Sequence, residues 1–237
     1  MEIIAALDFQ NADKAKDTVK SIGSCINYYK VGLELFVAAG PSLIDWLKSE
    51  NKKVFLDLKF HDIPNTASRA VIAASEYGVD MINIHTQGGI DMMKACVNSL
   101  DEFCGKKGVN RPLLIGVTLL TSLDNGYLQD FGIETESSDY VLKLAKYAKS
   151  AGLDGIVSSA KETKLIKDAL GSEFITVTPG IRPAGADAGD QKRIVTPKDA
   201  LELGSDYAVI GRPITAAENP SQAAKLILKE ISNADIQ

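Results

Sequence analysis

Cysteine is scarce in this chain of 237 residues, which contains Cys25, Cys96 and Cys104 and no others. The number is odd and no two of them have CxxC spacing, so neither a disulfide framework nor a structural zinc site is expected. Reduced, packed thiols in a cytosolic protein are the simpler interpretation. No secretory signal is recognisable, because charged residues already occur at Glu2 and Asp8. A cytoplasmic location is therefore expected.

Long apolar runs and an excess of positive charge are also lacking. No stretch approaches the length of a membrane span, so no membrane partner is expected. Lys and Arg total 26 against 31 Asp and Glu, and the net charge of −5 disfavours a broad nucleic-acid surface. A local cluster of Lys and Arg can still bind a small anion in an acidic protein.

Short apolar runs instead alternate regularly with amphipathic stretches. Eight runs have strand character, at residues 3–8, 28–32, 54–59, 80–85, 113–120, 154–159, 174–179 and 206–211. Most are apolar on both faces, as parallel strands covered by helices are. Eight such β–α units predict a single α/β domain over residues 1–237, folded as a (β/α)8 TIM barrel. A doubly wound open sheet is the alternative, but no GxGxxG follows the first run.

Polar side chains gather at or after the carboxyl ends of these runs. They are Asp8, Lys30, Asp57, Lys59, His85, Thr118, Thr121, Arg182 and Arg212. In a barrel of this kind the active site lies at that end of the strands. The clustering therefore predicts an active site there, whereas residues without a shared function would be spread over helices and loops.

Strand alternation gives a direction to the central pair. Asp57 and Lys59 are two positions apart, so they project from one face, about 6–7 Å apart along the strand. Leu56 and Leu58 face the other way, and if they pack under the helices, the charged pair points into the mouth of the barrel. Asp62 is out of phase with that pair, and the alternation leaves its direction open.

The loops after the seventh and eighth runs have the features of an anion site. Gly180 and Gly211 allow backbone N–H groups to approach an oxyanion closely. Arg182 and Arg212 offer forked donors suited to phosphate. The Gly- and Ala-rich stretch 183–190 is typical of a mobile lid. The alternative is an ordinary surface loop with two solvated arginines.

Lysines interleaved with carboxylates favour proton transfer or carbanion chemistry over metal binding, so no cofactor is expected. Opposite charges about 4 Å apart interact by about 4 kcal/mol at an effective dielectric of 20, and so keep one another ionised. Lys59 would then be an ammonium that donates a proton to a developing carbanion. Asp57 would repel a substrate carboxylate until CO2 departs, although the sequence does not determine how much of the rate this supplies.

The segment LDLKFHDIPNT at residues 56–66 resembles the D-x-K-x-x-D-I-P-x-T signature of the orotidine 5′-monophosphate decarboxylase family. The resemblance extends along the chain through ALDF (6–9), YKVG (29–32), VTLLTS (117–122), TPGIRP (178–183) and IGRPIT (210–215). It implies decarboxylation of orotidine 5′-monophosphate to UMP, the last step of de novo pyrimidine synthesis, without a metal or organic cofactor.

The resemblance also implies a role for each matching residue. In the reaction itself Lys59 protonates C6 of the pyrimidine, Asp57 lies near the substrate carboxylate, and Lys30 and Asp62 complete the catalytic group. The residues that hold the nucleotide are Asp8 and Lys30 for the ribose, Thr121 for the base, Arg182, Gly211 and Arg212 for the phosphate, and Gln191, which bridges phosphate and base from the lid. The family is a homodimer in which Asp62 and Thr66 serve the partner's site.

Two other functions stay open at this point. A metal-dependent sugar-phosphate decarboxylase or aldolase-like relative would carry an acidic ligand where this chain has Lys30, with Glu34 as a conceivable substitute. A non-catalytic phosphate-binding barrel would not need Lys59 and its flanking aspartates. His61 and His85 invite general-base roles, but hydrogen bonding or packing is the simpler expectation for both.

Overall fold

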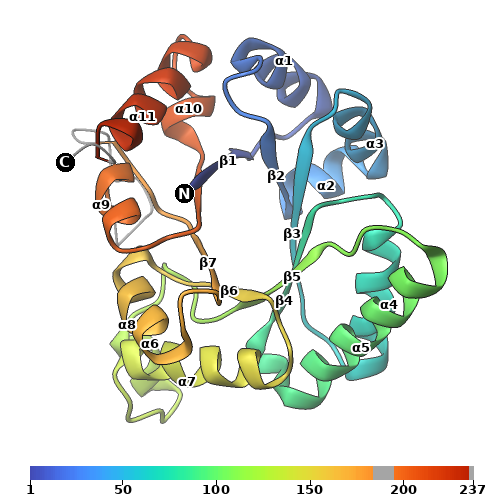
Figure 1. Cartoon of the computed structure of the whole chain (residues 1–237), viewed down its shortest axis with the longest axis vertical. Coiled ribbons are helices and arrows are strands. Elements are labelled where there is room, and N and C mark those ends of the chain that lie inside the picture. The colour runs from blue at the N-terminus through green and yellow to red at the C-terminus, as the bar shows by residue number, and fades with distance from the viewer. Residues whose placement is uncertain (184–194, 235–237) are drawn as a thin grey trace.

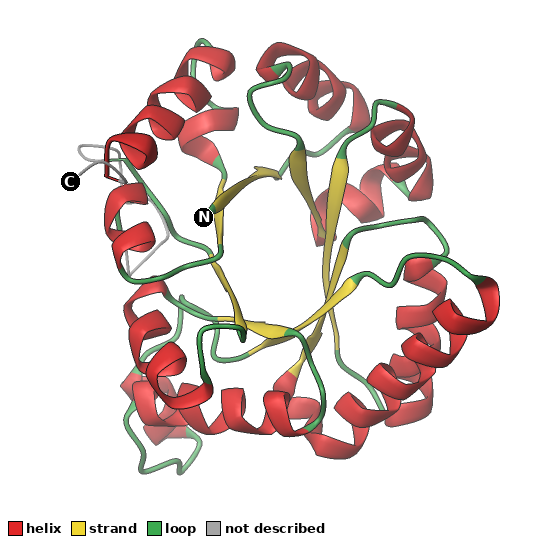
Figure 2. Cartoon of the chain, viewed as in Figure 1, coloured by secondary structure: helices red, strands yellow, loops and turns green. Residues whose placement is uncertain are grey.

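Eight parallel strands close into a barrel with helices around it in a computed structural model (Figures 1 and 2), which describes residues 1–183 and 195–234. The strands are β1 (Glu2–Leu7), β2 (Tyr28–Gly32), β3 (Lys53–Phe60), β4 (Met81–His85), β5 (Leu113–Val117), β6 (Gly155–Val157), β7 (Ile175–Thr178) and β8 (Tyr207–Ile210). Each pairs with the next in chain order, and β8 closes the barrel by pairing with β1. The predicted (β/α)8 TIM barrel is confirmed.

The outer layer consists of helices that follow the strands. They are α1 (Ala12–Ile22), α2 (Leu33–Ala39), α3 (Pro41–Ser49), α4 (Pro64–Ser75), the 3-10 turn η1 (Thr86–Gly88), α5 (Gly89–Lys107), α6 (Asn125–Asp130), α7 (Ser137–Ser150), α8 (Ala160–Leu170), α9 (Pro197–Glu202), α10 (Arg212–Thr215) and α11 (Pro220–Ala234). The short elements α2, α6, α10 and η1 were not predicted, because they are too brief to show a helical period. Among the described residues, no helix is both long and apolar enough to cross a membrane.

Strand alternation divides the core into two layers. Outward-facing residues such as Leu56 pack against the helices. Inward-facing residues fill the interior of the barrel in a separate cluster: Ile4, Ala6, Tyr28, Phe55, Met81, Ile115, Val177 and Val209. The barrel is therefore a packed core, and ligand space is available only at its ends.

Three aspartates at the amino ends of even-numbered strands tie the barrel together. Their Oδ2 atoms accept backbone N–H groups of the preceding strand at 2.7–2.8 Å: Asp80 from Val54, Asp154 from Leu114 and Asp206 from Thr176. Each of these carboxylates also pairs with a cation, from Lys48, Arg111 and Lys167 respectively. Such contacts satisfy the backbone where the strands begin and pair a partly buried charge.

Candidate active site

A continuous chain of opposite charges crosses the carboxyl end of the barrel. The Lys30 Nζ lies 2.9 Å from Asp8 Oδ1 and 3.4 Å from Asp57 Oδ2, and the Lys59 Nζ donates to Asp57 Oδ1 at 2.7 Å. Asp8 directly follows β1, Lys30 lies on β2, and Asp57 and Lys59 lie on β3. Each charge in the array therefore has a neighbour of opposite sign, which offsets the cost of removing it from water.

Lys30 is the most enclosed cation of this array. Its residue is 8% exposed, and Asp57 beside it is 7% exposed. Burial by itself would lower the pKa of Lys30, but the carboxylates of Asp57 and Asp8 outweigh that effect and the pKa is raised. Gly32 leaves the space for this ammonium, because a Cβ there would lie 2.8 Å from the Lys30 Nζ. Lys30 is therefore a fixed positive charge at neutral pH.

β3 does not run straight through the array. Leu56 pairs with Ile82 and Phe60 pairs with Ile84, so residues 57–59 face a single residue of β4. Within this bulge Lys59 has a φ of 51°, in the left-handed region that residues with a side chain rarely adopt. Asp57 and Lys59 both line the pocket at the mouth, as expected, but regular alternation ends at the bulge. Strand alternation therefore does not predict the direction of the side chains after the bulge.

Two adjoining pockets open at this end and share Lys30, Pro179 and Val209. The first, of about 260 Å³, is lined by Asp57, Lys59 and Thr121 together with apolar side chains such as Val117, Leu119 and Val177. The second, of about 390 Å³, is lined by Asp8, Gly180, Arg182, Gly211 and Arg212. The site can thus hold a molecule with a flat, partly apolar part at one end and an anion at the other.

The anion half combines backbone and guanidinium groups. Gly180 has a φ of 78°, a conformation that needs glycine. Arg182 is 6% exposed, whereas Arg212 is exposed at the start of α10. The sequence-predicted phosphate residues therefore do meet in one place, with one arginine embedded in the wall and one at the rim.

Two of the expected site residues, Asp62 and Thr66, lie outside the two pockets. Asp62 is exposed, and its Oδ1 accepts the backbone N–H of Ile63 at 2.7 Å. Thr66 is exposed in the first turn of α4. Neither lines the two pockets. Gln191 lies outside the described residues, as does the predicted lid after Pro183.

The two histidines lie side by side beyond the array, with ring centroids 5.3 Å apart. His85 Nδ1 is the one buried side-chain polar atom without a hydrogen-bond partner in the part of the chain that the structure describes. Burial, helped by the neighbouring His61 and Lys59, lowers the pKa of His85 to about 4. His85 is therefore neutral at pH 7. Neither histidine lines the two pockets.

Asn83 was not singled out from the sequence, although it touches the array. It is fully buried on β4, and its Nδ2 donates to Asp57 Oδ1 at 2.7 Å. Its Oδ1 accepts the backbone N–H of Lys59 at 2.8 Å. The available signal was a polar residue between the apolar Ile82 and Ile84 of the run 80–85.

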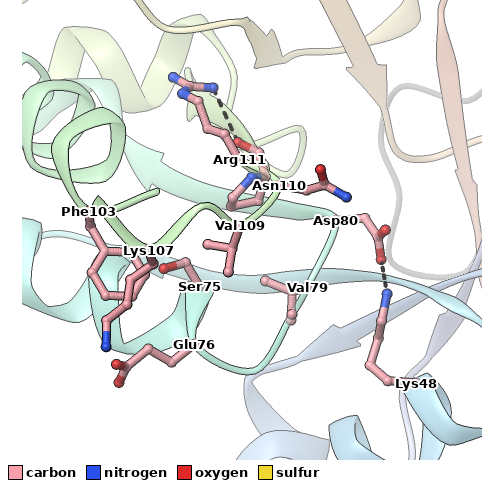
Figure 3. A pocket seen from close by; sticks show the side chains of 12 residues that line it. Lys48, Ser75, Glu76, Val79, Asp80, Phe103, Lys107, Val109, Asn110 and Arg111 are labelled. Atoms are coloured by element: carbon pink, nitrogen blue, oxygen red, sulfur yellow. Dashed lines mark hydrogen bonds and ion pairs between the residues drawn. The ribbon is translucent and has the colours of Figure 1, made fainter. Parts of the chain in front are cut away.

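A larger pocket, of about 600 Å³, is not at this site (Figure 3). Its lining, which includes Lys48, Asp80 and Arg111, comes from segments next to the amino ends of the strands. Lys48 pairs with Asp80 at 2.7 Å, and Arg111 donates to the Pro112 carbonyl and to Asp154. Barrel enzymes carry their chemistry at the opposite end, so the volume of a pocket does not identify the active site here.

Residues 1–183 and 195–234 contain no group of three His, Cys, Asp or Glu placed to hold a metal.

Comparison with known proteins gives a consistent result. A family model described as "Orotidine 5'-phosphate decarboxylase / HUMPS family" matches residues 1–227. The Orotidine 5'-phosphate decarboxylase of Aliivibrio fischeri (strain MJ11) is 51% identical over 231 residues, which cover 98% of this chain and 95% of that protein. The one from Carboxydothermus hydrogenoformans is 50% identical over 229 residues, covering 97% and 95%. The crystal structure of Orotidine 5'-phosphate decarboxylase from Lactobacillus acidophilus superposes with a TM-score of 0.86 at 38% identity, covering 97% and 98%.

Proposed function

The chain belongs to the Orotidine 5'-phosphate decarboxylase / HUMPS family. We therefore propose that it decarboxylates orotidine 5′-monophosphate to UMP in pyrimidine biosynthesis. The observation that carries the proposal is the unbroken array from Asp8 through Lys30 and Asp57 to Lys59. It adjoins a pocket with two arginines at the same end of the barrel. Relatives that are half identical over nearly the whole chain support the decarboxylase activity.

The two pockets accommodate the two ends of the nucleotide. The phosphate binds between Arg182, Gly211 and Arg212, where guanidinium and backbone donors converge. Lys30 lines both pockets and Asp8 lines the second, and the two side chains bind the ribose hydroxyls. The pyrimidine enters the narrower pocket beside Thr121, with its C6 carboxylate towards Asp57 and Lys59. Binding of the remote phosphate thereby positions the reacting carbon.

The reaction breaks the bond between C6 and the carboxylate carbon. CO2 departs, the bonding electrons remain on C6, and the Lys59 ammonium donates its proton to that carbon; the amine then regains a proton from solvent. A positioned proton donor contributes about 10²–10⁴-fold, and the fixed positive charge also stabilises the carbanion as it forms. Lys30 pairs with Asp57 from the other side, at 3.4 Å.

The active form is a homodimer to which Asp62 and Thr66 contribute across the interface. Large apolar side chains are exposed on the connections that follow β2 and β3: Val37 at 83%, Ile63 at 67% and Leu33 at 54%. Exposed apolar groups on α2 and at the start of α4 are typical of an interface. Asp62 and Thr66 flank Ile63 and are themselves exposed, so they are available to a second copy.

A metal-dependent sugar-phosphate enzyme is disfavoured by the charge at the end of β2. Lys30 is buried there with a raised pKa, and an ammonium in that place repels a divalent cation. Glu34, the conceivable substitute ligand, is exposed in the first turn of α2 and lines neither pocket. The described contacts therefore favour chemistry by lysine and carboxylate.

The decisive experiment follows the loss of orotidine 5′-monophosphate absorbance with purified protein after exhaustive chelation. Continued turnover is expected, together with a dimer in sedimentation of the same preparation. Absence of decarboxylation would remove the proposed function. Activity that disappears with chelator and returns with Mg²⁺ would favour the metal-dependent alternative, and a fully active monomer would contradict the shared site.

A further inference from the structure

We propose that Asn83 is a positioning residue for the decarboxylation, which fixes the Asp57 carboxylate and the backbone of Lys59 relative to each other. The inference rests on the proposed function, because it concerns how Lys59 is aimed at the substrate. Asn83 itself lines neither pocket, so it acts through its two neighbours.

The contacts form a closed ring of three residues. Asn83 Nδ2 donates to Asp57 Oδ1 at 2.7 Å, and the Lys59 Nζ donates to the same oxygen at 2.7 Å. The ring closes where the Lys59 backbone N–H donates to Asn83 Oδ1 at 2.8 Å. One carboxamide therefore holds the carboxylate on one side and the main chain of the proton donor on the other.

The backbone of Lys59 needs such a contact. Residues 57–59 bulge out of the β3–β4 ladder, and Lys59 has a φ of 51°. A residue with a Cβ avoids this conformation unless its surroundings enforce it. Within the bulge, the Asn83 side chain takes the place of a ladder acceptor for the Lys59 N–H. Without this acceptor, no hydrogen bond offsets the cost of the left-handed conformation at Lys59. The Lys59 backbone is then free to move, and the ammonium is no longer held in one position.

Asparagine suits this position because it presents a donor and an acceptor on one rigid plane. The partners also fix the orientation of the amide, since Asp57 is an acceptor and the Lys59 N–H is a donor. An aspartate in place of Asn83 keeps the acceptor but loses the donor to Asp57. An alanine loses both, and buried N–H groups without partners are costly.

Asn83→Ala and Asn83→Asp test the assignment through kcat, KM and the affinity for the product UMP. Both variants are expected to lower kcat by about 10–100-fold, because a displaced donor misses the reacting carbon. KM and UMP affinity are expected to change less than about threefold, because the phosphate and ribose contacts are untouched. Asn83→Asp preserves the size of the side chain, so it keeps the test available if the alanine variant does not fold.

Thr176→Val is the matched control. Thr176 is also a fully buried polar strand residue, and its Oγ1 donates to Asp206 Oδ2 at 3.1 Å at the other end of the barrel. This variant is expected to be less stable in urea with unchanged kcat. Folded Asn83 variants with kcat within about twofold of the wild type would overturn the inference, and so would parallel losses of kcat and UMP binding, or failure of both variants to fold. A wild type without turnover would instead remove the proposed function, and the inference with it.

Discussion

Lys167 and Lys59 each donate a 2.7 Å hydrogen bond to an aspartate, Lys167 near the amino ends of the strands and Lys59 near their carboxyl ends. The Lys167 ammonium also donates to two backbone carbonyl groups, at 2.7 and 2.9 Å, so its three N–H groups all have partners within the chain. Among the described residues, the Lys59 ammonium has Asp57 alone. All donors of Lys167 therefore bind groups of the protein, whereas Lys59 has N–H donors available for a ligand.

The aspartates differ in the same way. Asp206 accepts the backbone N–H of Thr176 in addition to Lys167, and Asp80 and Asp154 repeat that arrangement. Within the described part of the chain, Asp57 is held by side chains only. Carboxylates anchored to the backbone stabilise the barrel, whereas Asp57, which is held by side chains, faces the pocket. Similar ion pairs therefore serve stability at one end and chemistry at the other, as the general division of a barrel between its two faces suggests.

Replacing each lysine by methionine should separate these roles most strongly. For Lys59→Met, kcat is expected to fall by at least about 10³-fold, because the proton donor and the charge that stabilises the carbanion are both lost. For Lys167→Met, kcat should be unchanged while the free energy of unfolding falls by about 2 kcal/mol, because Asp206 loses its cation. Steady-state turnover and urea unfolding of both variants measure the contrast.

The crossed outcomes would break the comparison. If Lys59→Met kept more than a tenth of the turnover, Lys59 would not be the proton donor. If Lys167→Met lost turnover as well as stability, the two ends of the barrel would be coupled, and the division of labour would be wrong.

Features that depend on local sequence patterns could be predicted. Short apolar runs in alternation with amphipathic stretches predicted the barrel, and the charges at the ends of the runs predicted that Asp57, Lys59 and Arg182 lie at one end. The bulge at Lys59 could not be predicted, because a left-handed residue depends on an acceptor that another strand supplies, from Asn83. The contact of Asp206 with Thr176 was hidden for the same reason, since it joins residues 30 positions apart.

His85 extends the comparison to pH, because it leaves a buried nitrogen unpaired at the catalytic end. Burial lowers its pKa from 6.5 to about 4, so between these values the unfolded chain binds more protons than the folded one. Stability is therefore complete above pH 6.5 and is lost as the pH falls towards 4. His85→Leu should remove about 1–2 kcal/mol of that loss, after allowance for solvent screening of a partly exposed ring.

Urea unfolding of wild type and His85→Leu at a series of pH values checks this expectation. The difference at pH 8 gives the constant packing effect of the substitution, and only the additional change at lower pH counts. Parallel curves from pH 8 to pH 4 would show that the unpaired nitrogen does not weaken the catalytic end in acid.

The smallest expected effect concerns β2, which is preceded by an asparagine, whereas an aspartate precedes each of the other even-numbered strands. Asn27 precedes β2 as Asp80 precedes β4, and both carbonyl groups accept from the next strand, at 2.7 and 3.0 Å. The Asn27 Oδ1 accepts from the Lys52 Nζ at 3.1 Å without an ion pair. Asn27→Asp should raise the free energy of unfolding by about 0.5 kcal/mol, because it turns this contact into an exposed ion pair. The gain should disappear in about 1 M salt, where charges are screened within about 3 Å, and kcat should not change. A loss of stability at low salt would show that an aspartate before an even-numbered strand is favourable only where it also binds the backbone of the preceding one.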